Sequence, residues 1–254
     1  MANDYFSFKQ FTIWQDQCAM KVSTDACLFG AWVSDYIQKV ITQSQARSVP
    51  LRIADVGAGT GLLSLMIHQK NSTSTIEALE IDAPAAEQAR QNIAKAGAAA
   101  QLKVVTADVT TFLPSAPYDI IVSNPPFYQD DLKAAVQKRN WAFHDDTLTL
   151  SQLFLFISQH LQAGGYFFLL LPARREQEAE ALLRSAELTK VEKIIVRTNA
   201  RQMPHRMLVA GQRKQTGSTH LPIAIDQKEI CITSTEGSYS TAFTDLLKDY
   251  YLAL

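Results

Sequence analysis

From residue 51 onward, short apolar runs that favour β-strands alternate with stretches that carry a helical pattern. The expected strands are Leu51–Val56, Thr75–Ile81, Leu102–Thr106, Tyr118–Ser123, Gly165–Leu171, Val191–Thr198 and Arg206–Gln212. The expected helices are Leu62–Gln69, Ala85–Ala96, Leu148–His160 and Arg174–Ala186. This alternation predicts an α/β fold, a mostly parallel sheet with helices on both faces. Only Asn199–His205 joins the last two strands, which is too short for a crossover helix and predicts an antiparallel pair.

The two ends of the chain depart from this alternation. Near-alternating apolar residues from Phe6 to Ile13 predict one or two short strands, and Asp25–Val40 predicts a helix. The last part carries a β-like run, Glu229–Thr233, and an amphipathic helix near Tyr239–Leu252. We therefore expect three parts of the chain. Residues 1–50 form an N-terminal extension that contributes to the ligand-binding pocket, and residues 51–213 form the core. Residues 214–254 form a C-terminal strand and helix that pack on the core.

Composition narrows the classes of protein that fit this fold. The 254 residues include 24 basic and 25 acidic side chains, and the net charge of −1 excludes a globally basic nucleic-acid binder. Any RNA contact must then come from a local basic patch. The three cysteines form no CxxC pair, so neither a disulfide framework nor a metal site is expected. With no leader pattern and no long apolar run, we expect a cytoplasmic protein, not membrane-bound, that is a monomer or a weak homodimer.

The strongest local motif is the turn between the first core strand and its helix, Asp55-Val-Gly57-Ala-Gly59-Thr-Gly61. Glycines let the backbone approach a ligand where a Cβ would clash, and the following helix N-terminus offers free N–H groups to a negative group. The GxGxG spacing differs from the GxGxxG of dinucleotide-binding proteins, and no Walker lysine follows. We call residues 57–61 the glycine loop.

Two later strands end in carboxylates that extend this motif. Glu80 and Asp82 lie about 20 residues beyond the loop, where a carboxylate accepts the ribose hydroxyls of a nucleoside. Glu80 is preferred because it lies closer to the strand end. Asp108, followed by Val109, comes after the third strand, where a carboxylate can accept a hydrogen bond from the exocyclic amine of adenine.

The order and spacing of these features resemble the class I S-adenosylmethionine-dependent methyltransferases. The resemblance implies S-adenosyl-L-methionine as cofactor and a Rossmann-like, seven-stranded, mostly parallel sheet with an antiparallel last strand. It implies that Asp55 orders the loop and the methionine end, that Glu80 binds ribose, and that Asp108 binds adenine.

The fourth strand ends in Asn124-Pro125-Pro126-Phe127. The two prolines fix φ and remove two N–H donors, which holds the Pro125 carbonyl rigid beside the amide oxygen of Asn124. Two fixed acceptors can bind one NH₂ group, expose its lone pair and stabilise the charge that develops as a methyl group arrives. Phe127 offers a flat face for a planar ring. The motif resembles the signature of amino-group methyltransferases, in which Asn124 would contact both donor and target.

The most distinctive stretch is Lys9–Trp32, which contains Met20-Lys21-Val22-Ser23-Thr24-Asp25 at the start of the expected helix. Thr24 or Asp25 is expected to cap the helix, and Lys21, Thr24 and Asp25 are expected to lie near the methionine end of the donor or the target pocket. With Asn124–Phe127, this stretch resembles the bacterial methyltransferases that modify N6 of adenine 37 in the anticodon loop of a valine tRNA. The resemblance covers essentially the whole chain. It implies a valine tRNA as partner and N6-methyladenosine as product.

An RNA substrate needs contacts to its phosphates and a target base that leaves its stack. Basic residues that follow strand ends are expected to supply the phosphate contacts, and an aromatic residue is expected to stack. The expected substrate-binding residues are Tyr128, Lys133, Arg139, Arg174, Arg201 and Arg206.

Three alternatives share part of the pattern. A guanine-N2 methyltransferase for ribosomal RNA has compatible chemistry and is separated mainly by the N-terminal stretch. A protein glutamine-amide methyltransferase would need a peptide groove and no basic patch. An S-adenosylmethionine-binding adaptor without activity has no need for the two acceptors at Asn124 and Pro125. A dehydrogenase is disfavoured by the GxGxG spacing.

Overall fold

The computed structural model describes residues 3–18, 20–42, 50–125, 148–214 and 226–254. Its strands are β1 (Tyr5–Ser7), β2 (Thr12–Trp14), β3 (Arg52–Val56), β4 (Thr75–Glu80), β5 (Leu102–Thr106), β6 (Tyr118–Ser123), β7 (Leu161–Pro172), β8 (Leu188–Arg197), β9 (Arg206–Arg213) and β10 (Asp226–Cys231). Its α-helices are α1 (Thr24–Tyr36), α3 (Leu62–Lys70), α4 (Ala83–Lys95), α6 (Leu150–His160), α7 (Glu176–Ser185) and α8 (Thr241–Leu247). A π-helical turn (Ile37–Thr42) follows α1, and a 3₁₀ turn (Ala173–Arg175) precedes α7. None of the helices in these ranges is both long and apolar enough to cross a membrane.

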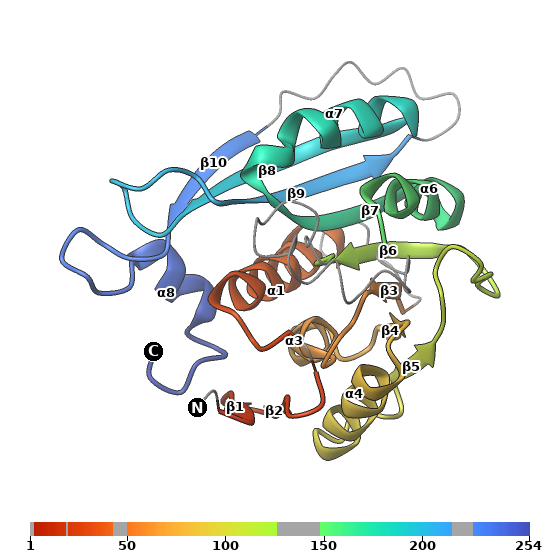
Figure 1. The fold of residues 1–254 in the computed structure, drawn as a ribbon, viewed down its shortest axis with the longest axis horizontal. Helices are drawn as coiled ribbons and strands as arrows, with labels where there is room; N and C mark the ends of the chain where they lie inside the picture. Colours follow the sequence, from red (N-terminus) through yellow and green to blue (C-terminus); the bar gives the residue numbers. More distant parts are fainter. Residues whose placement is uncertain (1–2, 19, 43–49, 126–147, 215–225) are drawn as a thin grey trace, which may run out of the picture.

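Eight strands form one sheet in the order β10-β8-β9-β7-β6-β3-β4-β5 (Figure 1). The neighbouring strands are parallel except at β9, which runs antiparallel to both β7 and β8. The mostly parallel Rossmann-like sheet and the antiparallel pair β8–β9 are thus confirmed. The expected seven strands become eight, because β10 pairs with β8 at the sheet edge. Residues 227–229 of β10 are exposed, so this strand lacks the apolar alternation that identifies a sheet member in sequence.

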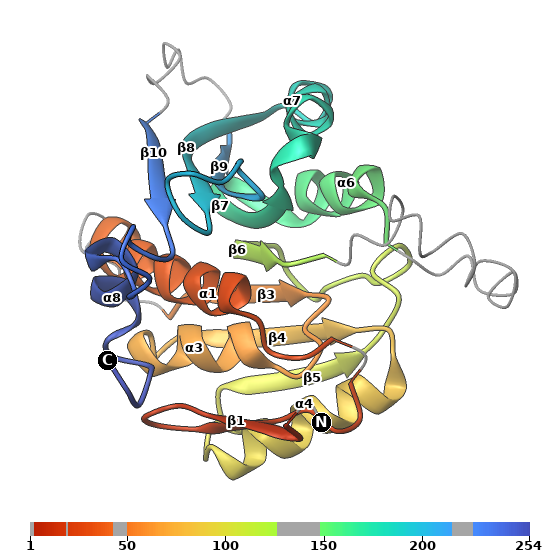
Figure 2. The ribbon, with the colours of Figure 1, turned by 60° about the vertical axis from the view of Figure 1, so that its left-hand side comes forward.

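Helices cover both faces of the sheet, so successive residues of a central strand enter different layers (Figure 2). Ile120 and Val122 of β6 pack with residues of α1 and α3, whereas Ile121 packs with residues of α6 and α7. All three side chains are fully buried. Burial on both faces explains why β6 reads as a continuous apolar run.

The cap of α1 differs from the expected one. Ser23, rather than Thr24 or Asp25, precedes the first turn, and its hydroxyl accepts a hydrogen bond from the backbone N–H of Ala26 at 3.2 Å. Ser23 has the extended backbone that a capping residue needs. Asp25 lies inside the first turn, which leaves its carboxylate for a contact elsewhere.

The expected N-terminal strands are present as an antiparallel hairpin in which Tyr5 pairs with Trp14. The hairpin continues into the C-terminal tail: Phe8 bridges to Tyr251, and the backbone N–H of Lys9 donates to the carbonyl of Tyr250 at 2.8 Å. In Figure 1 this hairpin and α8 lie on the side of the sheet covered by α1 and α3. The division of the chain at residues 50 and 213 stays a prediction.

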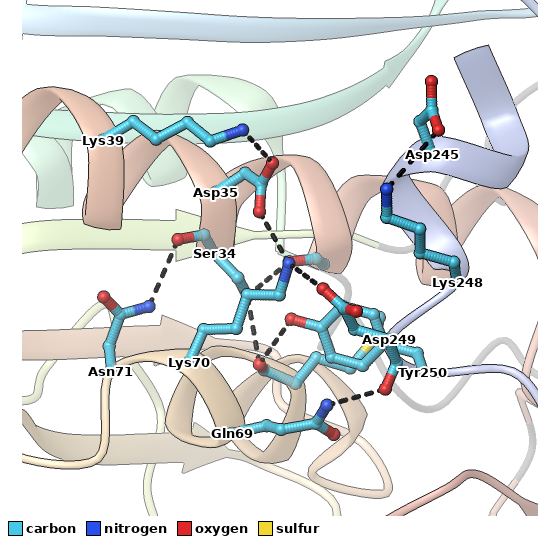
Figure 3. Close-up of polar contacts among 12 residues, drawn as sticks. Ser34, Asp35, Lys39, Gln69, Lys70, Asn71, Asp245, Lys248, Asp249 and Tyr250 are labelled. Atoms are coloured by element: carbon cyan, nitrogen blue, oxygen red, sulfur yellow. Dashed lines mark hydrogen bonds and ion pairs between the residues drawn. The ribbon is translucent and has the colours of Figure 1, made fainter. Parts of the chain in front are cut away.

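Lys70 of α3 links α1 to the tail (Figure 3). Its Nζ lies 2.7 Å from a carboxylate oxygen of Asp35 and 2.9 Å from one of Asp249. Burial opposes ionisation of Asp35, but hydrogen bonds from Lys39 and Lys70 outweigh it and lower the pKa of this carboxyl. The tail is therefore held by charged contacts as well as by the hairpin.

Candidate functional site

The candidate functional residues follow the carboxyl ends of four adjacent parallel strands. The glycine loop follows β3, Glu80 ends β4, Asp108 follows β5 and Asn124 follows β6. The strand register places these ends side by side. In an open α/β sheet this edge is where ligands bind.

The glycine loop requires its glycines for two reasons. Gly57, Gly59 and Gly61 have φ values of 73°, 54° and 79°, a left-handed conformation that other residues rarely adopt. A Cβ at Gly57 or Gly59 would meet open space among the described residues, with no atom within 4 Å. The loop therefore leaves room for a ligand against its backbone, as the motif predicts.

The two carboxylates at the end of β4 have different hydrogen-bond partners. Glu80 is buried, and it accepts hydrogen bonds from the backbone N–H groups of Gly59 at 2.7 Å and of Asp82 at 2.9 Å. The carboxylate of Asp82 accepts from the backbone N–H of Ala85 at 3.0 Å and caps α4. Glu80 therefore faces the glycine loop, in keeping with the preference for it over Asp82, whereas the side chain of Asp82 serves the helix.

Asp55 lies under the loop and is fully buried. Its Oδ2 accepts from the backbone N–H and the hydroxyl of Ser64, at 3.1 and 2.7 Å, while Oδ1 has no hydrogen-bond partner among the described residues. Burial, with a smaller contribution from Glu80, raises the pKa of Asp55 to about 6, and the bonds from Ser64 oppose this shift. A buried carboxylate with an unpaired oxygen is costly, and a cationic ligand group offsets that cost.

Asp108 begins a turn after β5. Its Oδ1 accepts from the backbone N–H of Thr110 at 2.8 Å and from the Thr110 hydroxyl at 2.7 Å, and both Asp108 and Val109 are half-buried. Ile81, which we did not single out in the sequence, is 47% exposed between Glu80 and Asp82. A single exposed apolar side chain is common at protein surfaces, so the place of Ile81 between Glu80 and Asp82 is the only feature that connects it with the candidate site.

Asn124 is half-buried and Pro125 is buried, directly after β6. The preceding Ser123 donates its hydroxyl hydrogen to the carbonyl of Val56 at 2.7 Å, which ties the end of β6 to the start of the glycine loop. The expected residues Pro126, Phe127, Tyr128, Lys133 and Arg139 lie outside the described residues. The paired-acceptor geometry at Asn124 and Pro125 stays a prediction.

The residues ahead of α1 take different places. Lys21 is exposed, and its Nζ donates to the carbonyl of Gln15 at 2.7 Å. Thr24 is half-buried as the first residue of α1. Asp25 contacts Nε2 of His205 at 3.0 Å and Nε of Arg206 at 3.3 Å. Sequence reasoning missed this cluster, because nothing local links residues 180 positions apart.

Three of the expected basic residues, Arg174, Arg201 and Arg206, lie within the described residues. Arg206 begins β9 opposite Pro172, and Arg174 lies in the turn that follows Pro172. Arg201 is exposed in the connection between β8 and β9. Arg206 pairs with Asp25, whereas no ion pair joins Arg174 or Arg201 to another residue of the described ranges. In those same ranges, no group of three or more His, Cys, Asp or Glu side chains is placed to hold a metal ion.

A glycine loop, an acidic residue ending the next strand and an antiparallel strand inserted in a Rossmann-like sheet define the class as a Rossmann-like methyltransferase. Residues 19–198 match the family of methyltransferase small domains, and the chain belongs to this family. The fold agrees with solved structures. A protein from Agrobacterium tumefaciens, described as a predicted O-methyltransferase, is similar with a TM-score of 0.64 at 19% identity, over 89% of this chain and 96% of that one.

Curated relatives match at higher identity. A protein of Parabacteroides distasonis named tRNA1(Val) (adenine(37)-N6)-methyltransferase is 37% identical over 100% of both chains. Proteins of the same name are 34% identical in Bacteroides thetaiotaomicron, over 100% of both chains, and 35% identical in Cronobacter sakazakii, over 97% of this chain and 94% of that one.

Proposed function

We propose that this chain is an enzyme that transfers a methyl group from S-adenosyl-L-methionine to N6 of adenine 37 in the anticodon loop of a valine tRNA. The observation that carries the proposal is the match to relatives of that name over the full length, at 37% identity in the first case. The match includes the N-terminal hairpin and the tail as well as the core. We further propose that the protein acts in the cytoplasm as a monomer or a weak homodimer.

The described residues fit the proposed donor. Glu80 would accept the ribose hydroxyls, which its position against Gly59 supports, and Asp108 would accept from the adenine amine. The unpaired oxygen of Asp55 is suited to the positively charged methionine end. When bound, the sulfonium group supplies an already activated methyl group, so the chain's own task is positioning.

The target amine requires help because its lone pair is delocalised into the adenine ring. We assign the amide oxygen of Asn124 and the carbonyl of Pro125 as its two acceptors. Both acceptors would bind the N–H bonds, direct the lone pair at the methyl group and stabilise the positive charge on the nitrogen. Ser123, bonded to the Val56 carbonyl, supports this pair because it fixes the end of β6 beside the glycine loop. As the N–C bond forms, the bond between the methyl group and the donor sulfur would break and S-adenosylhomocysteine would leave. One of the two N–H protons would then be lost to water, and N6-methyladenine keeps the other.

The RNA would lie over the part of the sheet edge formed by β6, β7 and β9, next to the first turn of α1. Arg174 and Arg201 have no ion pair with the described residues and are suited to phosphate contacts. Arg206 keeps its two Nη groups for a ligand while its Nε faces Asp25. Loop bases leave their stack at low cost, which suits an anticodon loop as the substrate.

The test is methyl transfer from labelled S-adenosyl-L-methionine to unmodified tRNA transcripts, with ribosomal RNA and a protein extract in parallel. We expect N6-methyladenosine at adenine 37 of the valine tRNA. Label in guanine or in glutamine would retain amino-group chemistry and overturn the assigned target. Donor binding without any label would favour an adaptor.

A further inference from the structure

Two buried amides on α4 have no place in the proposed chemistry. Gln88 and Asn92 are 1% and 0% exposed and lie one helical turn apart, on the same face. Buried amides require hydrogen-bond partners. Both find them in residues 14–18 and 20–22, which we call the N-terminal segment. This segment begins at the end of β2, which contacts α4.

Asn92 joins the N-terminal segment to the glycine loop. Its Oδ1 accepts from the backbone N–H of Trp14, and its Nδ2 donates to the carbonyl of Trp14, both at 2.9 Å. The same Nδ2 donates its second hydrogen to the carbonyl of Thr60, also at 2.9 Å. Thr60 lies between two glycines with positive φ, where the backbone has little intrinsic preference. One side chain therefore fixes both chain segments.

Three side-chain contacts hold the loop and the start of α3, in addition to the backbone N–H groups of Gly57 and Ala58, which donate to the carbonyl of Leu79 at 2.8 and 3.1 Å. Glu80 binds the N–H of Gly59, Asp55 binds Ser64, and Asn92 binds the carbonyl of Thr60. The first two come from strands that end at the loop. Only the contact through Asn92 depends on residues outside the sheet.

Hydrogen bonds join the two ends of the N-terminal segment, and Cys18 within it is close enough to Glu80 for an electrostatic effect. The side-chain oxygen of Gln15 accepts from the backbone N–H of Val22, and its backbone carbonyl accepts from Nζ of Lys21, both at 2.7 Å. Within this closed segment Cys18 is buried, and burial together with the carboxylates of Glu80 and Asp82 raises the pKa of its thiol to about 11. The segment thus lies within electrostatic range of the proposed ribose ligand.

We propose that Asn92 is a positioning residue that couples the N-terminal segment to the glycine loop and so preorganises the donor site. With Asn92 in place, Thr60 is held before the donor arrives, and binding does not have to order the loop. The coupling is reciprocal, so donor binding also stabilises the segment. This inference rests on the proposed use of S-adenosyl-L-methionine but not on the identity of the RNA.

Gln88 provides a matched control. Its Oε1 accepts from the backbone N–H of Gln17 at 2.9 Å, and no hydrogen bond from its side chain to the glycine loop occurs among the described residues. Asn92→Ala and Gln88→Ala each remove a buried amide and leave an N–H of the segment unpaired. Only the first also releases Thr60.

The experiment measures S-adenosylhomocysteine affinity by calorimetry for the wild type and both variants. We expect Asn92→Ala to weaken binding about tenfold, the scale of one or two lost hydrogen bonds, and Gln88→Ala to weaken it much less. RNA affinity measured without donor should not change in either variant. Equal weakening by the two variants, or wild-type affinity in Asn92→Ala, would overturn the inference.

A second measurement needs no variant and covers the case in which Asn92→Ala fails to fold. Hydrogen exchange of the wild type with S-adenosylhomocysteine should slow in peptides that cover residues 12–17 as well as 57–64. Slowing confined to 57–64 would contradict the coupling. A wild type that binds no S-adenosylhomocysteine would overturn the proposed cofactor and this inference together. Donor binding with label in a different acceptor would overturn the tRNA assignment alone.

Discussion

The edge of the sheet where the proposed ligands bind has two halves, and the residues that contact one another are closer in sequence in one half than in the other. In the donor half, formed by β3, β4, β5 and the loops that follow them, three side chains bind the loop and the start of α3 from nearby in sequence: Asp55 binds Ser64 9 positions away, Glu80 binds Gly59 21 positions away, and Asn92 binds Thr60 32 positions away. In the target half, formed by β6, β7, β9 and the first turn of α1, Asp25 meets His205 across 180 positions. The donor half is built mainly from one continuous stretch of chain, with the N-terminal segment as a more distant support through Asn92, whereas the target half joins both ends of the chain. Donor binding should therefore survive changes that stop methyl transfer.

Asn124→Ala tests this separation most strongly. Loss of one of two acceptors that act on the developing charge should lower the rate of methyl transfer by at least about 10²–10³-fold. Donor affinity should stay within a few-fold of the wild type, which calorimetry with S-adenosylhomocysteine would show. A large loss of donor affinity would instead place Asn124 in the donor half and break the separation.

Glu80→Gln tests the donor half, with Asp82→Asn as its matched control. The first change removes a charge that faces Gly59 and the proposed ribose position, and should weaken donor binding about 100-fold. Asparagine caps a helix as well as aspartate does, so Asp82→Asn should leave donor affinity and Tm nearly unchanged. If the two variants lose equal affinity, the preference for Glu80 is wrong.

Asp55→Asn tests the cost of the buried acid. The pKa of Asp55 is about 6 in the folded chain against an ordinary 3.8, so the folded state binds the proton more tightly. Folding therefore becomes less favourable as pH rises through this window, and the cost is complete above about pH 7. The unfolding free energy of the variant, relative to wild type, should rise by on the order of 2 kcal/mol from about pH 4 to pH 7. Urea titrations at both pH values would measure it, and a flat difference would contradict the shift.

Arg201→Ala and Arg206→Ala test the target half with the smallest effects. Each should weaken RNA binding a few-fold and lower the salt slope of binding by about one, as for one lost phosphate contact. Arg206→Ala should also lower Tm, because the partly buried Asp25 loses a partner, whereas the exposed Arg201 should not. An unchanged salt slope in both variants would place the RNA elsewhere.

The same difference in distance explains what the sequence could predict. The core strands and helices follow from local periodicity, and the preference for Glu80 over Asp82 followed from its place at the end of β4. Asp82 is two residues further, where its carboxylate reaches the first turn of α4 instead. These are contacts within one strand-to-helix connection, for which position along the chain is a sufficient guide.

The features that the sequence did not predict depend on contacts between residues that are distant in sequence. Ser23, Thr24 and Asp25 are all acceptable caps, and only the approach of His205 and Arg206 explains why Asp25 is used elsewhere. β10 carries polar residues on exposed positions, so its place in the sheet follows from β8 rather than from its own pattern. Asn92 appears in sequence as an ordinary polar residue of a helix, although the fold buries it completely.

The contact between the hairpin and the tail bears on the order in which a nascent chain becomes competent. Lys9 donates through Nζ to the carbonyls of Lys248 and Leu254, the latter 245 positions away. At about 5–20 residues per second, a ribosome adds the residues between Cys231, the end of β10, and Leu254 in about 1–5 seconds. The hairpin leads directly into the segment held by Asn92, so we expect this segment, and with it the support at Thr60, to be weaker until the tail has been made. A newly made chain would then form its sheet before its donor site is fully supported.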